Sequence, residues 1–121
     1  MGHKGTFPLG SEPTGSVAKP FGKDKNDFVA EFSNIGADTD ITGPGVGVIS
    51  TVPTGYGVMS GTSMACPAAA GAAARLLAHA PLLLAMPRNQ ARSDAIVKAV
   101  YAAAHVLGFG PSFEGKGLVL T

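Results

Sequence analysis

The sequence contains a single cysteine, Cys66, among 121 residues. One cysteine excludes an intramolecular disulfide and a cysteine-based metal site. We interpret Cys66 as a small buried hydrophobe rather than as a reactive thiol. No loop has the clustered carboxylates that a calcium site needs. We therefore expect no cofactor and assign no metal site to these residues, while calcium binding by a longer enzyme and the cellular compartment stay open.

Charged and aromatic residues are also scarce, at 14 % and 7 % of the chain, and tryptophan is absent. A net charge of +1 without a dense basic tract argues against a nucleic-acid surface, and the few aromatics argue against a base-stacking platform. The most hydrophobic region, residues 64–87, contains Arg75, His79, Pro81 and Pro87, which a membrane span would tolerate poorly. We expect neither nucleic acid nor a membrane as a partner.

Glycine and proline are plentiful, with 17 and nine copies, and they divide the chain into short segments. Residues 1–27 show no clear period and are predicted to be mostly loop. Residues 28–32 and 118–120 predict short strands. Residues 46–52 and 56–60 flank a turn signal, so they predict an antiparallel β-hairpin.

Two helices are expected after the hairpin. Residues 62–79 begin with Thr62, whose hydroxyl suits an N-cap. No charged residue lies between Ser63 and Ala74, and a helix that is apolar all round is usually buried all round. Gly71 lowers helix propensity, so we expect it to allow close packing of a neighbour. Residues 91–104 predict a second, amphipathic helix.

The most informative segment is the run GTSMACP at residues 61–67, followed by Gly71. It places Ser63 on a small-residue turn at the start of an apolar helix. A hydroxyl in this position lies among unpaired backbone N–H groups and at the positive end of the helix dipole. That environment favours an attacking alkoxide and a developing oxyanion.

The run resembles the nucleophile segment of the subtilisin-like serine proteases, the subtilase family or peptidase S8. Other segments resemble the family in the same order along the chain. They are residues 32–36 (F-S-N/S-x-G), 40–45 (D-x-x-x-P-G), 46–60 (the hairpin before the nucleophile) and 115–118 (G-x-G-x-[ILV]). The resemblance covers residues 28–120.

This resemblance implies a serine endopeptidase with a three-layer α/β/α fold and a mainly parallel sheet. Ser63 would be the acyl-accepting nucleophile, and its N–H would contribute to the oxyanion hole. Thr62 could lend its hydroxyl to that hole, although simple capping explains it equally well. Met64 would pack behind the serine. Ala68 stands where the family often has a histidine. Most family members are exported, which suggests a secreted or extracellular enzyme.

The partners of the nucleophile are missing. The family orders its triad Asp, His, Ser, and neither its D-[ST]-G turn nor its H-G-T-H segment occurs here. His79 lies 16 residues after Ser63 on the same expected helix, about 24 Å away. His105 is expected at the far end of the second helix, and His3 in an unstructured start. Asn34 does not correspond to the family's oxyanion asparagine.

We therefore interpret residues 1–121 as the C-terminal segment of a subtilisin-like peptidase domain, with residues 28–120 as its family-like core. The Asp, the His, the oxyanion Asn and most substrate-binding strands would lie upstream, and peptides or proteins would be the substrates. Alone, the chain should be nearly inactive and should self-associate through uncovered apolar faces. The alternatives are an inert small domain that acts by binding or self-association, and complementation by another chain. Cleavage specificity stays open.

Overall fold

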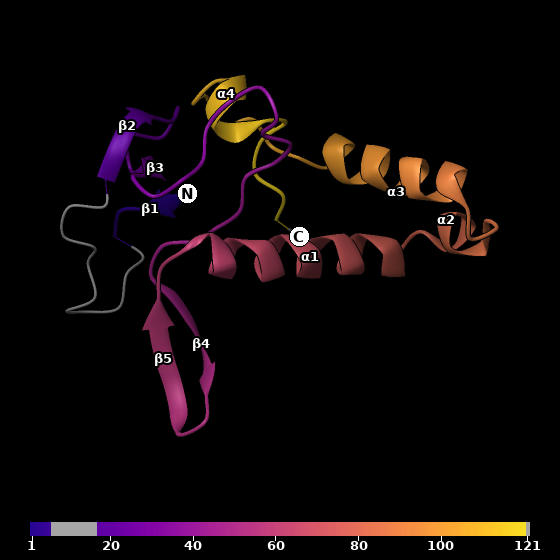
Figure 1. Ribbon diagram of the computed structural model, residues 1–121, viewed down its shortest axis with the longest axis horizontal. Helices are drawn as coiled ribbons and strands as arrows, with labels where there is room; N and C mark the ends of the chain where they lie inside the picture. Colours follow the sequence, from indigo (N-terminus) through magenta and orange to yellow (C-terminus); the bar gives the residue numbers. More distant parts are fainter. Residues whose placement is uncertain (6–16, 121) are drawn as a thin grey trace.

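A computed structural model describes residues 1–5 and 17–120 of the chain. Its elements form two small antiparallel sheets and a set of helices (Figure 1). In chain order they are β1 (Gly2–His3), β2 (Val17–Phe21), β3 (Asp27–Ala30), β4 (Val48–Val52), β5 (Gly55–Met59), α1 (Thr62–Ala78), α2 (Pro81–Ala85), α3 (Gln90–Ala102) and α4 (Pro111–Glu114).

The N-terminal sheet has the strand order β1-β3-β2, with both pairings antiparallel. Its central strand, β3, supplies Phe28 and Ala30, which pack with Val46 as one buried cluster. The prediction that residues 1–27 are mostly loop is wrong for the part described, because β1 and β2 lie within it. Residues 6–16 lie outside the described residues. The sheet was missed because β1 pairs with a strand 24 residues away, a partner that no local pattern reveals.

The predicted hairpin is confirmed. Strands β4 and β5 pair in register from Val48 opposite Met59 to Val52 opposite Gly55. The two residues between the strands form the turn, and Gly55 has a φ of 132° that other residues rarely adopt. The hairpin projects away from the rest of the molecule (Figure 1).

Helix α1 has the predicted bounds to within one residue, but the expectation that it is buried all round is wrong. Of its residues, only Ala72 is buried. The helix is covered on one side, where Ala72 packs with Val100 and Val119 in a second core cluster. Gly71 is exposed, and a Cβ there would find no atom within 4 Å, so the expected close neighbour is also absent among the described residues.

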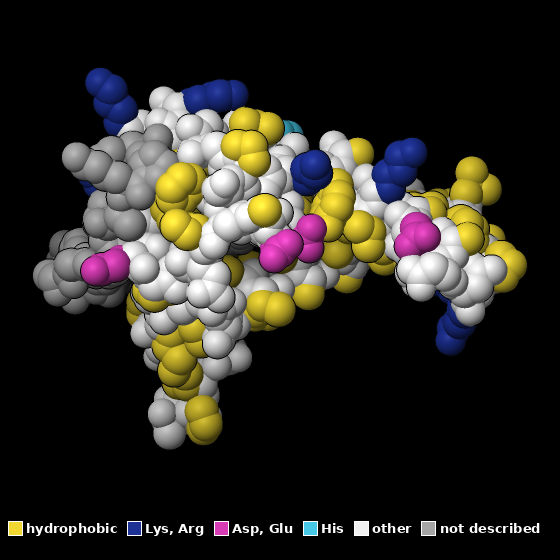
Figure 2. Space-filling view, turned by 45° about the horizontal axis from the view of Figure 1, so that its top comes forward, with side chains coloured by type: hydrophobic (Ala, Val, Ile, Leu, Met, Phe, Trp, Pro, Cys, Tyr) yellow, Lys and Arg dark blue, Asp and Glu magenta, His cyan; other side chains and the backbone are white. Residues whose placement is uncertain are grey.

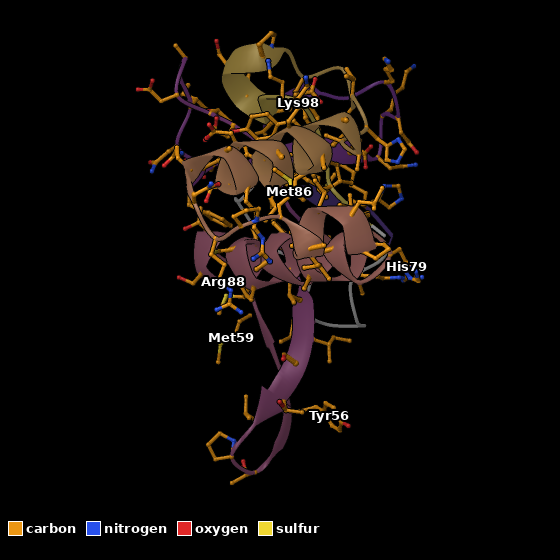
Figure 3. The ribbon with its side chains drawn as sticks, turned by 90° about the vertical axis from the view of Figure 1, so that its right-hand side faces the viewer. Tyr56, Met59, His79, Met86, Arg88 and Lys98 are labelled. Carbon is orange, nitrogen blue, oxygen red and sulfur yellow. The ribbon has the colours of Figure 1, made fainter. Side chains whose placement is uncertain are left out.

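The predicted second helix is confirmed as α3. Val100 faces the core as expected, whereas Val97 is 45 % exposed. Lys98 projects from α3 on the side away from α1 (Figure 3). The short helices α2 and α4 were not predicted. Hydrophobic side chains are visible over the hairpin and near the α2 end of the molecule (Figure 2), where Leu82 is 85 % exposed.

The expected final strand is reduced to single bridges. Leu118 pairs in parallel with Thr42 and in antiparallel with His105. These bridges join the C-terminal residues both to the segment that leads into the hairpin and to the end of α3. The α/β class is therefore confirmed, while the two sheets that the described residues form are antiparallel.

A buried carboxylate holds the connection between α3 and α4. Glu114 is 2 % exposed. Its Oε2 accepts a hydrogen bond from the N–H of Leu107 at 2.6 Å, and its Oε1 accepts from Gly108 at 3.0 Å and Gly110 at 3.1 Å. Three charge-assisted bonds compensate for removing this carboxylate from water.

Candidate active site

Ser63 is the second residue of α1, directly after the hairpin. Gly61, in an extended conformation, is the N-cap, and its carbonyl accepts hydrogen bonds from the N–H of Met64 and of Ala65. The prediction that Thr62 is the N-cap is wrong by one residue, since Thr62 begins the helix and no side chain caps it. Within the described residues, the N–H groups of Thr62 and Ser63 have no acceptor. They are the orphan donors of a helix start.

The side chain of Ser63 is exposed, and within residues 1–5 and 17–120 its hydroxyl has no hydrogen-bond partner. It borders a cavity of about 220 Å³ between the start of α1 and one face of the hairpin. The lining residues are Val48, Ser50, Thr51, Val52, Gly57, Met59, Ser63, Met64 and Pro67. Ser63 therefore borders a largely apolar space, and the N–H groups of Thr62 and Ser63 beside it have no acceptor among the described residues.

A larger groove of about 600 Å³ runs along another side of α1. Small residues of α1 form one wall, and the segment from Phe32 to Gly45, with Val100 and Phe113, forms most of the rest. Thr62 borders this groove, whereas Ser63 borders the smaller cavity. Cys66 also lines the groove and is exposed, so the prediction that it is buried is wrong for this chain.

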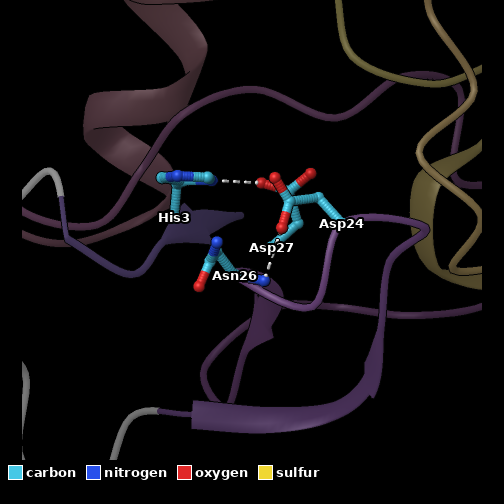
Figure 4. Close-up of polar contacts among 4 residues, drawn as sticks. All are labelled: His3, Asp24, Asn26 and Asp27. Carbon is cyan, nitrogen blue, oxygen red and sulfur yellow. Dashed lines mark hydrogen bonds and ion pairs between the residues drawn. The ribbon is translucent and has the colours of Figure 1, made fainter.

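The three histidines lie elsewhere. His79, labelled in Figure 3, is the C-cap of α1, whereas Ser63 is the second residue of that 17-residue helix. His105 exchanges backbone hydrogen bonds with Leu118. His3 is not in an unstructured start: it belongs to β1, and its Nδ1 lies 2.8 Å from Asp27 Oδ1 (Figure 4). The structure therefore brings no histidine to Ser63. Asn34, which borders the larger groove, is not a partner of Ser63 either.

Among the described residues, two ionisable groups have shifted pKa values, and Met1 and Asp40, the partner of Tyr101, both line the larger groove. A hydrogen bond to the Asp40 carboxylate, with added burial and charge repulsion, raises the pKa of the Tyr101 phenol. Burial lowers the pKa of the Met1 amino group, which donates to the carbonyl of Gly43 at 2.8 Å. Neither group contacts Ser63.

Residues 40–45 were noted in the sequence only as a D-x-x-x-P-G segment, and their contact with the Ser63 turn was not predicted. The N–H of Gly61 donates to the carbonyl of Gly45 at 2.7 Å, and the N–H of Gly47 donates to Ser60 Oγ at 3.0 Å. A sequence signal that could have pointed to this contact is the alternation of glycine at positions 43, 45 and 47.

Residues 14–110 match the family model described as Subtilase family. The chain is 41 % identical over 99 residues to Subtilisin DY of Bacillus licheniformis, an alignment that covers 79 % of this chain and 32 % of that protein. It is 58 % identical over 52 residues to Alkaline elastase YaB of Bacillus sp. (strain YaB), covering 42 % of this chain and 14 % of that protein. It is 38 % identical over 93 residues to Intracellular serine protease of Paenibacillus polymyxa, covering 74 % and 27 %.

The chain spans about a third of the length of the curated relatives it matches, or less. None of the helices in the described part of the chain has the length and apolar character needed to cross a membrane.

Proposed function

This chain belongs to the subtilase family, and from that premise we propose that it is the C-terminal segment of a serine endopeptidase domain with Ser63 as nucleophile. The observation that carries the proposal is the position of Ser63. Its exposed hydroxyl lies on the first turn of α1, next to N–H groups that have no acceptor among the described residues. A developing oxyanion is best stabilised by such fixed donors.

In the proposed reaction, Ser63 Oγ attacks the carbonyl carbon of a peptide bond while its proton passes to a histidine base. The N–H of Ser63 donates to the resulting oxyanion, and the Thr62 hydroxyl could add a second donor. The tetrahedral intermediate collapses, the C–N bond breaks, and the leaving amine takes the proton from the histidine. Water then attacks the acyl-enzyme, returns the proton to Ser63 and releases the carboxylic acid.

The base and its orienting Asp must come from outside the described residues, because none of the described histidines lies at Ser63. We propose that an upstream part of the same domain carries them, together with the oxyanion Asn and the parallel strands of a three-layer α/β/α fold. The small-residue groove of about 600 Å³ along α1 supports this, since alanine side chains allow another backbone to approach closely.

The large exposed area of the chain supports the proposal that a further part of the domain covers it. The chain exposes 7558 Å² at a mass of 12.1 kDa. A compact protein of this mass exposes about 6,000 Å². The difference of about 1,500 Å² exceeds the roughly 800 Å² that each partner contributes to a standard protein–protein interface. Without the upstream part, we expect the chain to self-associate, and a compact monomer at high concentration in size-exclusion chromatography would contradict this.

The whole enzyme would act on peptide or protein substrates, and export is the expectation for most of the family. One relative, from Paenibacillus polymyxa, is named Intracellular serine protease, so the names of the relatives do not all point to export. The second candidate function is an inert domain that acts by binding. It is favoured for the isolated chain by the lack of a base at Ser63 among the described residues.

The test is to express the chain with the reading frame that precedes it and to measure cleavage of a casein substrate. We expect cleavage that Ser63→Ala abolishes. Ser112→Ala is the matched control, because Ser112 is also exposed and is also the second residue of a helix after a glycine N-cap. Equal cleavage by Ser63→Ala and by the unsubstituted protein would exclude Ser63 as the nucleophile. No cleavage by either would favour the binding function.

A further inference from the structure

The turn that carries Ser63 is held against one short segment, residues 43–47, at very close range. The N–H of Gly61 donates to the Gly45 carbonyl at 2.7 Å, which is short for an N–H···O bond. The Gly61 carbonyl, on the other side of the same residue, accepts the first bonds of α1. Gly61 is therefore fixed on both sides, and the orientation of the first turn depends on where Gly45 lies.

The space between the two segments has no room for a side chain. A Cβ added to Gly45 would lie 2.8 Å from the Gly61 carbonyl oxygen and 3.1 Å from Ala65 Cβ. A Cβ added to Gly43 would lie 2.8 Å from the Ala65 carbonyl oxygen. Neither glycine has a left-handed backbone, unlike Gly47 with a φ of 66°. Glycine is required at positions 43 and 45 for close approach and not for backbone conformation.

The segment is itself anchored on the side away from α1. The N–H of Gly45 donates to the Met1 carbonyl at 2.9 Å, and the N–H of Thr42 donates to the Gly117 carbonyl at 2.9 Å. Gly43 and Gly45 are both buried. A displacement of Gly61 cannot be relieved by moving this segment without breaking its bonds to two other parts of the chain.

We infer that Gly45 is a positioning residue for the nucleophile: its carbonyl sets Gly61, and through Gly61 the direction in which Ser63 Oγ projects. This inference rests on the proposed function. A misplacement of about 1 Å at a reacting atom can lower the rate about 100-fold. Gly45→Ala should therefore reduce the reactivity of Ser63 even where the fold is retained.

The first readout uses the 121-residue chain and needs no activity. Hydrogen exchange of the Gly61 amide, followed by NMR, should be at least about tenfold faster in Gly45→Ala, because its acceptor is displaced. Gly71→Ala is the matched control: its Cβ meets nothing within 4 Å, so Gly61 exchange should not change. Unchanged exchange of the Gly61 amide in Gly45→Ala would overturn the inference.

The second readout is the rate at which a fluorophosphonate labels Ser63 in the protein expressed with its upstream reading frame. Gly45→Ala should lower the maximal labelling rate constant by about 10- to 100-fold, with the half-saturating probe concentration unchanged. A purely structural effect would instead reduce the fraction of protein labelled and leave the rate constant of that fraction intact. Equal rate constants would refute the positioning role while leaving the proposed function standing.

Ser60→Ala keeps the inference testable if Gly45→Ala does not fold. It removes only the exposed bond from the Gly47 N–H to Ser60 Oγ and should lower the rate constant by about two- to fivefold. No change in this variant, with Gly45→Ala unfolded, would count against the inference. If the unsubstituted protein is not labelled at all, the proposed function itself fails, a result distinct from equal rate constants.

Discussion

Replacing Glu114 by alanine should destabilise this chain strongly although the residue lies far from Ser63 in sequence. The side chain is 2 % exposed and accepts hydrogen bonds from three backbone N–H groups, those of Leu107, Gly108 and Gly110, at 2.6, 3.0 and 3.1 Å. Truncation removes both acceptor oxygens, and with them all three hydrogen bonds, at once. It also releases the connection between α3 and α4, which leads to the bridges of Leu118.

The magnitude follows from these contacts. A hydrogen bond to a charged group contributes about 1.5–3 kcal/mol to stability. The three contributions do not add fully, because water reaches some of the exposed donors after truncation. We expect Glu114→Ala to lower the free energy of unfolding by about 3–5 kcal/mol. Glu114→Gln keeps one acceptor oxygen but turns an amide toward an N–H donor, so it should cost about 1–3 kcal/mol.

Urea unfolding followed by far-ultraviolet circular dichroism measures the loss. Glu31→Gln is the matched control, because Glu31 is exposed and accepts no hydrogen bond from the described residues. Its free energy of unfolding should stay within about 0.5 kcal/mol of the unsubstituted chain. A urea midpoint for Glu114→Ala equal to that of Glu31→Gln would refute the assigned role of the Glu114 carboxylate.

Three further predictions concern α1, α3 and the groove. Gly71→Ala should stabilise the isolated chain by about 0.5–1 kcal/mol, because no atom lies within 4 Å of the added Cβ; lower stability in urea unfolding would contradict this. In a Tyr56→Phe background, Tyr101 should titrate above its ordinary value of 10.0 in ultraviolet absorbance, and Asp40→Asn should lower that pKa. Because folding raises the pKa of Tyr101, its protonated phenol stabilises the folded state. That stabilisation is present below pH 10.0 and is lost as pH rises through the pKa of Tyr101. The Cys66 thiol should react readily with a disulfide reagent in the isolated chain and should be protected in the protein with its upstream part; equal reactivity in both would exclude cover over the groove.

The local features of the site could be predicted from the sequence. The turn signal around Pro53 and Gly55 and the β-branched residues before it are enough to define the hairpin. The alanine-rich run, uncharged between Ser63 and Ala74, defines α1, because it contains no proline after Pro67 and the single Gly71 costs only about 1 kcal/mol of helix propensity. Both elements are short-range in sequence, so the position of Ser63 in the first turn of a helix follows from neighbouring residues alone.

The long-range contacts could not be predicted in this way. The pairing of β1 with β3 and the bond from Gly61 to Gly45 join residues whose proximity depends on the whole fold. Glu114 was not singled out because a glutamate is ordinarily a surface residue. The N–H groups that it binds, those of Leu107, Gly108 and Gly110, lie only four to seven residues away, but no local pattern showed that they meet its side chain.

The burial of α1 shows a different limit of the sequence. An apolar circumference predicts that a helix should be covered, but it does not say which residues supply the cover. Among the described residues, Val100 and Val119 cover one side at Ala72, and most of the helix stays accessible. The apolar circumference of α1 led to the burial prediction, which is wrong for this chain. The same apolar circumference supports cover of the helix by an upstream partner.

The most direct test of the account is to find where a fluorophosphonate attaches in the protein expressed with its upstream reading frame, by peptide mass mapping. We expect one adduct, on the hydroxyl of Ser63, and none on the 121-residue chain alone. Losing the histidine of such a triad lowers turnover about 10⁶-fold, a figure that comes from a subtilisin itself. An adduct on another residue, or equally fast labelling of the isolated chain, would contradict it.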